Sequence, residues 1–187
     1  MSEFVHLQVK SHYSLKSGLP TPKDIVDAAY KNGLKAVALT DKNSFFGIIK
    51  FYNYAISKGI KPICGVDFDI ESNLKGLTKG LLLAKNKKGL EKLFSLSTKS
   101  YLQANKGIKI NENEILALRD DIIFILPSDN FSVYKSTDIQ EEKDVIATID
   151  ALKNTFSSNL YLGVTNYSDD AYDENSSNLI KFCSEKN

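Results

Sequence analysis

Short apolar runs alternate with longer amphipathic stretches along most of the 187-residue chain, and this alternation restricts the possible folds more than any other feature. The apolar runs predict strands at residues 4–9, 35–41, 61–70, 79–86, 121–127 and 159–166. The amphipathic stretches predict helices at residues 22–33, 44–59, 88–103, 110–118, 142–156 and 174–187. Strands that alternate with helices form βα units, so we expect an α/β domain with a largely parallel sheet.

The order of the predicted strands fits either an open doubly wound sheet or part of a barrel. The chain ends on a predicted helix with no strand after it, so a barrel would keep an open edge. We therefore expect residues 1–187 to form one domain that is a fragment of a longer protein. The polar stretch at residues 128–144 is the best candidate for a mobile insertion.

Composition narrows the class of protein. The hydrophobic fraction of 42% and the charged fraction of 25% are typical of a soluble globular protein. A net charge of +1 predicts no strong field, and Arg119 is the only arginine, although arginine is the preferred residue for bidentate phosphate contacts. The sequence shows neither an apolar leader nor an apolar run of membrane-spanning length, so we expect a cytoplasmic protein without membrane contact. Cys64 and Cys183 match no zinc-binding spacing, and Cys64 is expected to be a buried thiol.

Polar side chains stand where the predicted strands end, which is the usual place for functional residues in parallel α/β folds. They are His6, Gln8, Lys10, Ser11, His12, Thr40, Asp41, Lys42, Asn43, Asp67, Asp69, Lys79, Thr165, Asn166 and Tyr167. The set is rich in carboxylates and lysines, but both of its histidines belong to the first segment. The glycines form no phosphate-binding loop and no GxSxG nucleophile turn.

Four segments of the first half resemble a known family. FVHLQVKSHYSLKSG, ALTDKNSFFGIIKFY, GIKPICGVDFDI and LLLAKNKKGLEKL are similar to the N-terminal PHP (polymerase and histidinol phosphatase) domain of bacterial DNA polymerase III alpha subunits. The second half resembles it more weakly, through IIFILPS and the segment that begins NLYLGVTN. The resemblance implies a PHP-type distorted (β/α)7-like barrel, incomplete in this chain and without the polymerase core.

The resemblance also identifies positions where metal-binding members carry ligands. Those members read H-L-H-V-H on the first strand, where this chain keeps His6 but has Gln8 and Lys10. They read T-D-H after the second strand, where this chain has Asp41 and Lys42. A glutamate on the third strand is replaced by Asp67, and a histidine before LLLA is replaced by Lys79. A last histidine falls at about Tyr167.

These replacements predict a degenerate metal site and no metal cofactor in this chain. An ammonium group offers three donors and no lone pair, and three lysines repel a cation. Phosphoester hydrolysis by this fold needs closely spaced divalent ions held by imidazoles and carboxylates. We expect Lys10, Lys42 and Lys79 to neutralise Asp41 and Asp67 instead, because an unpaired buried carboxylate is costly.

Simpler structural roles remain open for the same residues. His6 fits a hydrogen-bonded strand histidine, and His12 fits a solvated or capping residue in a turn. Asp41 fits a cap of the following helix equally well, and Asp67 and Asp69 fit the solvent face of an edge strand. The aromatic row at residues 45–54 is mostly core, with an exposed part that is available to a partner.

Three functions follow from these expectations. The first is a non-catalytic module that stabilises the remainder of the alpha subunit and docks the proofreading exonuclease (epsilon) subunit. DNA would then be reached through the holoenzyme, and magnesium would be bound in the absent polymerase core. The second is an active metal-dependent phosphoesterase, such as a 3′–5′ exonuclease, a pyrophosphatase or a histidinol-phosphatase-like enzyme. The third is a free-standing binding protein.

Overall fold

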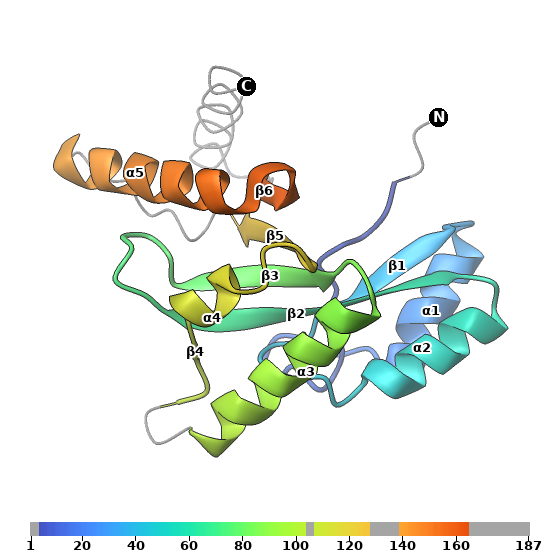
Figure 1. The fold of residues 1–187 in the computed structure, drawn as a ribbon. Coiled ribbons are helices and arrows are strands. Elements are labelled where there is room, and N and C mark those ends of the chain that lie inside the picture. The colour runs from blue at the N-terminus through green and yellow to red at the C-terminus, as the bar shows by residue number, and fades with distance from the viewer. Residues whose placement is uncertain (1–3, 104–106, 128–138, 165–187) are drawn as a thin grey trace.

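The structure is a computed structural model, and it describes residues 4–103, 107–127 and 139–164 (Figure 1). Its elements are α1 (Pro22–Lys31), β1 (Ala36–Leu39), α2 (Ile48–Ser57), β2 (Lys61–Glu71), β3 (Lys79–Ala84), α3 (Lys87–Leu102), β4 (Ile110–Asn111), α4 (Glu112–Leu116), β5 (Ile122–Pro127), α5 (Ile139–Phe156), the 3-10 turn η3 (Ser157–Asn159) and β6 (Leu160–Gly163). None of the helices in these ranges is long and apolar enough to cross a membrane.

The strands form one open sheet in the order β1-β2-β3-β5-β6, with β4 paired to β2. The expected α/β class is confirmed, and the sheet is mixed. The pairs β1–β2, β2–β4 and β5–β6 are parallel, as expected, whereas β3 is antiparallel to both of its neighbours, β2 and β5. The reason lies in the link at residues 72–78, which is too short for a crossover helix, so the chain turns back against β2.

The first segment differs from its prediction. Residues 4–9 are not assigned as a strand, but they run beside β1: Ala38 N–H donates to the His6 carbonyl (3.0 Å) and Thr40 N–H donates to the Val9 carbonyl (2.8 Å). Val9 N–H donates to the Thr40 hydroxyl at 2.9 Å. In a regular β-ladder a backbone carbonyl would accept this hydrogen bond.

Two other predictions change in detail. The predicted helix at 110–118 begins instead with the short strand β4 and continues as α4. Residues 139–144 of the predicted mobile insertion belong to α5. Residues 128–138, the end of the predicted sixth strand and the predicted helix at 174–187 lie outside the described residues.

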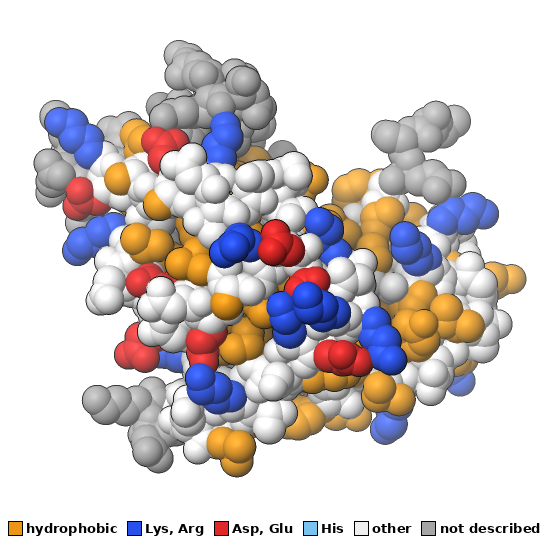
Figure 2. All heavy atoms as spheres, in the orientation of Figure 1, with side chains coloured by type: hydrophobic (Ala, Val, Ile, Leu, Met, Phe, Trp, Pro, Cys, Tyr) orange, Lys and Arg blue, Asp and Glu red, His pale blue; other side chains and the backbone are white. Residues whose placement is uncertain are grey.

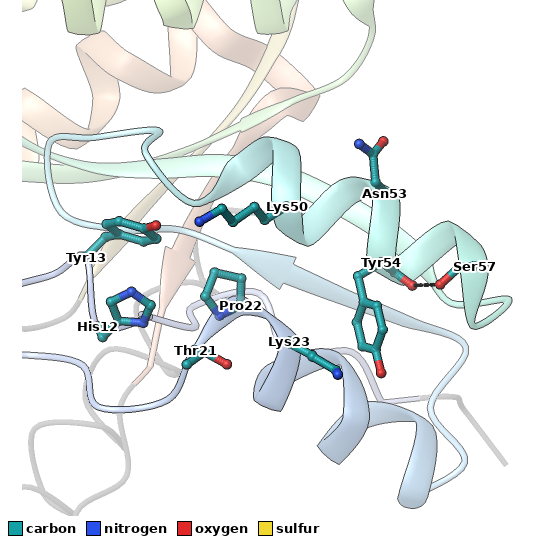
Figure 3. Close-up of a pocket in the computed structure, with 9 residues that line it drawn as sticks. All are labelled: His12, Tyr13, Thr21, Pro22, Lys23, Lys50, Asn53, Tyr54 and Ser57. Atoms are coloured by element: carbon teal, nitrogen blue, oxygen red, sulfur yellow. Dashed lines mark hydrogen bonds between the residues drawn. The ribbon is translucent and has the colours of Figure 1, made fainter.

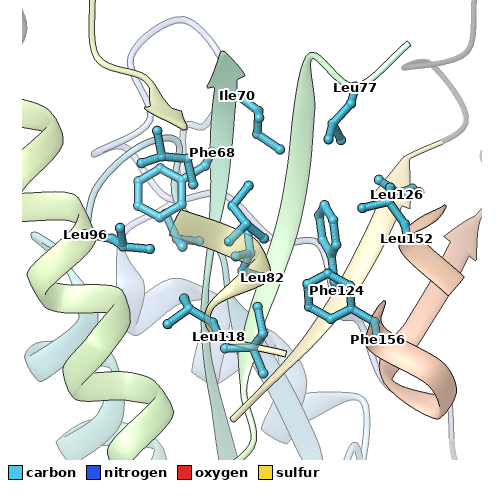
Figure 4. Packing of buried hydrophobic residues seen from close by; sticks show 14 of the residues in the cluster. Phe68, Ile70, Leu77, Leu82, Leu96, Leu118, Phe124, Leu126, Leu152 and Phe156 are labelled. Atoms are coloured by element: carbon cyan, nitrogen blue, oxygen red, sulfur yellow. The ribbon is translucent and has the colours of Figure 1, made fainter. Parts of the chain in front are cut away.

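The larger apolar core covers one face of the sheet (Figure 4). The strands supply Val66, Phe68, Leu82, Phe124 and Leu126, and α3, α4 and α5 supply the residues that pack against them, among them Leu93, Ile115, Leu152 and Phe156. Fully burying one such side chain contributes about 1.5–3 kcal/mol. This core therefore fixes which face of β2 points away from the helices.

A second core joins α1 and α2 to β1. Val26, Leu39 and Phe51 are almost completely buried in it, and Cys64 of β2 is buried there too, as the sequence predicted. Phe45, just before α2, packs against both cores and meets Phe94 of α3 edge to face, with ring centroids 4.8 Å apart. Phe45 thus links the two cores near the end of β1, where the predicted site residues lie.

Candidate functional site

Two carboxylates are buried where β1 ends against β2. Asp67 N–H donates to the Asp41 carbonyl at 3.1 Å, and Asn43 N–H donates to the Asp67 carbonyl at 2.9 Å. Asp41 is 1% exposed and Asp67 is 5% exposed. Because β2 side chains alternate between faces, and Val66 and Phe68 point into the helix-covered core, Asp67 points to the opposite face. The prediction that these two positions lie together is confirmed by these backbone bonds.

Asp41 is held by two buried serines of the turn that follows residue 10. Its Oδ1 accepts from Ser11 N–H (2.7 Å) and from the Ser14 hydroxyl (2.6 Å), and its Oδ2 accepts from the Ser11 hydroxyl (2.7 Å). The Ser14 oxygen in turn accepts from Lys42 N–H at 2.9 Å. Asp41 therefore fastens the 11–18 turn to the end of β1.

Asp67 is paired with Lys10. The Lys10 Nζ lies 2.6 Å from Asp67 Oδ2, with side-chain exposures of 24% for the lysine and 7% for the aspartate. The ammonium group thus lies against the buried carboxylate, at the edge of the buried region.

Asp69 completes the row of carboxylates. Its Oδ2 lies 3.2 Å from Lys42 Nζ and accepts from Asn43 Nδ2 at 3.0 Å, while Asp69 N–H donates to Asn43 Oδ1 at 2.8 Å. Lys79 is the cross-strand partner of Asp69 in the β2–β3 register, so both lie on the face that carries Asp67.

The six predicted positions therefore have different outcomes. Five of them occupy neighbouring positions in the first segment, just after β1, and on β2 and β3: Lys10, Asp41, Lys42, Asp67 and Lys79. Gln8 is exposed on the extended segment ahead of Lys10, and Tyr167 lies outside the described residues. Lys10, Lys42 and Lys79 were expected to neutralise Asp41 and Asp67, and this is confirmed for Lys10 and Asp67, which form an ion pair. Lys42 pairs with Asp69 instead, and Asp41 accepts from serine donors rather than from a lysine.

The simpler roles can be judged as well. Asp41 does not cap the next helix, because the N-cap of α2 is Gly47 and no side chain caps it. Asp67 does not face solvent. His6 is exposed, with its ring edge to face with that of Phe4, and His12 is an exposed turn residue beside Tyr13.

Sequence reasoning gave no role to Ser11 and Ser14 and did not find the pairing of Asn43 with Asp69. The sequence signal for Asn43 was weak, because an asparagine four residues after β1 fits many turns. In the structure Asn43 has φ +52°, a left-handed conformation in which asparagine is enriched. Burial raises the pKa of the Cys64 thiol to about 11, so this cysteine is a protonated thiol at neutral pH and no nucleophile.

Within residues 4–103, 107–127 and 139–164, no group of three His, Cys, Asp or Glu side chains is close enough to share a metal ion. The charged groups at this site instead form the pairs described above, with lysine ammonium groups beside Asp67 and Asp69.

The structure thus defines an open α/β sheet with ion pairs at Asp67 and Asp69 of β2. Residues 6–167 match the PHP domain family, and the chain belongs to that family. A DNA polymerase III subunit alpha from Buchnera aphidicola subsp. Schizaphis graminum is 37% identical over 130 residues, which are 67% of this chain and 11% of the relative. The same subunit from Pasteurella multocida is 32% identical over 173 residues, which are 88% of this chain and 15% of the relative.

Among solved structures, an amidohydrolase from Chromobacterium violaceum is 21% identical, with a TM-score of 0.43, and the match covers 51% of this chain and 32% of that one. The chain thus spans only a small part of the polymerase subunits that it resembles in sequence.

The serine contacts of Asp41 lead to a stability prediction. Ser14→Ala removes a donor to a buried carboxylate and leaves Lys42 N–H without its acceptor, so it should lower the free energy of unfolding by about 1–3 kcal/mol. Ser17→Ala changes an exposed serine of the same turn and should leave stability within about 0.5 kcal/mol. Urea unfolding followed by circular dichroism measures both, and equal small effects would contradict the role given to Ser14.

Proposed function

We propose that this chain is the PHP module of a replicative DNA polymerase III alpha subunit, and that it has a degenerate metal site and no catalysis of its own. In this proposal it stabilises the rest of the alpha subunit and docks the proofreading exonuclease subunit. The polymerase relatives support the proposal that this chain belongs to a longer polymerase subunit, because they match most of this chain over a small part of their own length. Polymerisation, with its magnesium, would then belong to other parts of that longer protein.

The observation that carries the proposal is the Lys10–Asp67 contact of 2.6 Å. At this distance the ammonium group of the lysine offsets the negative charge of the carboxylate oxygen. The same ammonium group repels any cation that approaches that oxygen, and it has no lone pair to offer a metal. Lys42 stands in the same relation to Asp69 at 3.2 Å. The donor set therefore does not fit the divalent ions that a PHP phosphoesterase would need, and no catalytic step is assigned to them.

The remaining carboxylate at these positions is equally unsuited to a metal. Both oxygens of Asp41 accept hydrogen bonds from Ser11 or Ser14, and its surroundings are almost closed to solvent. An ion at Asp41 would have to displace the serine donors and open the turn. An active phosphoesterase would lack histidine ligands at four of its expected positions, which hold Gln8, Lys10, Lys42 and Lys79.

The lysines on the α3 face are paired with carboxylates, which argues against a DNA-binding surface there. On α3, Lys88 and Lys92 lie 3.6 and 2.7 Å from Asp121, and Lys99 pairs with Glu114. Figure 2 shows lysine and carboxylate side chains interspersed over this face. Since neighbouring carboxylates offset these charges, the proposal places DNA in contact with the holoenzyme rather than with this module.

The absence of catalysis can be measured directly. The purified chain should show no turnover of p-nitrophenyl phosphate or of a 3′-ended single strand when manganese or zinc is added, because the ligand positions hold ammonium groups. An unrelated active PHP phosphoesterase, assayed in parallel, controls for the conditions. Turnover that increases with the amount of protein and is lost in a folded Asp67→Asn variant would contradict the proposal.

An exposed apolar surface on α2 is the candidate for docking the exonuclease subunit. Phe46, Ile49, Tyr52 and Ile56 are 63%, 63%, 45% and 55% exposed, while Phe51 of the same helix is fully buried. Residues 49, 52 and 56 have the spacing of one helix face. The expected exposed part of the aromatic row is thus present, and exposed apolar side chains in one row favour contact with a protein partner.

The proposed docking surface on α2 can be tested by mutation. Mixed with a purified proofreading exonuclease subunit, the chain should form a complex in analytical ultracentrifugation, and Ile49→Lys should weaken it about tenfold or more by placing a charge in the interface. Leu19→Lys changes an apolar residue outside α2 that is 94% exposed, and it should leave the affinity unchanged. If no complex forms, the docking role is wrong. If Ile49→Lys binds normally, α2 is not the surface.

A further inference from the structure

A pocket lies between α1, α2 and the turn at His12 and Tyr13, apart from the row of carboxylates (Figure 3). Its volume is about 550 Å³, within the range of small-ligand sites. Tyr13, Pro22 and Tyr54 give it flat ring surfaces, and His12, Lys23 and Lys50 give it groups that carry or can carry positive charge. None of its lining residues in the described part of the chain is acidic.

The ring surfaces are fixed by packing. A Cβ atom at Gly47 would lie 2.9 Å from Tyr13 Cδ2 and 3.0 Å from Pro22 Cγ, so only glycine there lets both rings approach the start of α2. Tyr54 donates its hydroxyl to Asp27 Oδ1 at 2.7 Å, and Lys23 Nζ lies 5.2 Å from the centroid of its ring. The pocket is therefore preorganised rather than a gap between mobile side chains.

Nearby acids offset the positive charge at the rim only in part, since Asp24 interacts with Lys23 and His12. Lys50 forms an ion pair with no residue in the described ranges, and in Figure 3 it extends from α2 toward Tyr13. The Asp24 carboxylate accepts from both the amide and the hydroxyl of Thr21 (2.9 and 2.7 Å), which directs it to the helix cap. These hydrogen bonds first, and then the charges of Lys23 and His12, lower the pKa of Asp24.

We propose that this pocket binds a nucleoside phosphate, with the base against the rings of Tyr13 and Pro22 and the phosphate at Lys50. A planar base suits flat aromatic and proline surfaces, and lysine binds phosphate as a point charge. The same chemistry is offered by a free mononucleotide and by the 5′-phosphorylated end of a DNA strand. The second source would bring DNA into contact with this module, in contrast to the function proposed above. The inference rests on neither the metal site nor the polymerase relatives, so it can fail independently of them.

The test is a set of titrations of the chain by isothermal calorimetry and amide chemical shifts. Thymidine 5′-monophosphate should bind at the pocket, and thymidine or inorganic phosphate should each bind about fivefold more weakly or worse, since each lacks one half of the recognition. A 5′-phosphorylated trinucleotide that binds more tightly than the mononucleotide assigns the site to a strand end. The reverse order assigns it to a free nucleotide.

Variants separate the two halves of the site. Lys50→Met should weaken mononucleotide binding about fivefold or more and leave thymidine binding unchanged. Gly47→Ala keeps every charge but moves Tyr13 and Pro22, so it should weaken both ligands. Lys31→Met, an exposed lysine at the far end of α1, is the matched control and should change neither.

Three results would overturn the proposal. Inorganic phosphate that binds as well as the mononucleotide would show that the rings take no part. Normal mononucleotide binding by Lys50→Met, with shifts away from α1 and α2, would place the ligand elsewhere. Tighter binding of a short polyglutamate peptide than of either nucleotide would mean that the pocket recognises acidic peptides.

Discussion

The burial of two adjacent carboxylates is the constraint on which the centre of this structure depends. Asp41 and Asp67 are joined through their backbones where β1 meets β2, and both are almost fully removed from solvent. A buried carboxylate without partners costs several kcal/mol. Two kinds of partner offset this cost: serine donors form hydrogen bonds with Asp41, and the Lys10 ammonium group pairs with Asp67.

Each solution also positions another part of the molecule. The serine bonds fasten the turn after residue 10, and that turn carries His12 and Tyr13 into the pocket beside α1 and α2. The Lys10–Asp67 pair fastens the first segment to β2, although that segment makes only a partial ladder with β1. The paired residues around Asp41 and Asp67 therefore connect the first segment and its turn to β1 and β2, and the proposed scaffold role depends on the rigidity of these contacts.

Much of this arrangement could be predicted from the sequence, because the apolar pattern and the strand ends are local signals. They predicted that Asp41 and Asp67 lie close together, and the family resemblance added Lys79 to the same site. The alternation in VDFDI did not reveal the burial of Asp67, since it also fits an edge strand facing solvent, and only the packing of Val66 and Phe68 against the helices decides between the two.

Other features depended on partners that are distant in sequence or on chain geometry. The serines hold Asp41 across about thirty residues, a pairing that no local pattern encodes. β3 runs antiparallel to β2 because the link at residues 72–78 is too short to hold a crossover helix. The prediction missed this because strands and helices alternate along the rest of the chain.

The central claim is that Lys10 provides the positive charge that buried Asp67 requires. A double-mutant cycle of Lys10→Met, Asp67→Leu and the double variant, measured by denaturant unfolding, tests it most directly. Because Asp67 is buried and Lys10 is 24% exposed, the account predicts a coupling energy of about 1–3 kcal/mol, between the values for exposed and buried pairs. The double variant should then recover much of the stability that Lys10→Met loses. A coupling energy near zero would contradict the account, because it would show that the lysine contributes nothing to the carboxylate it contacts.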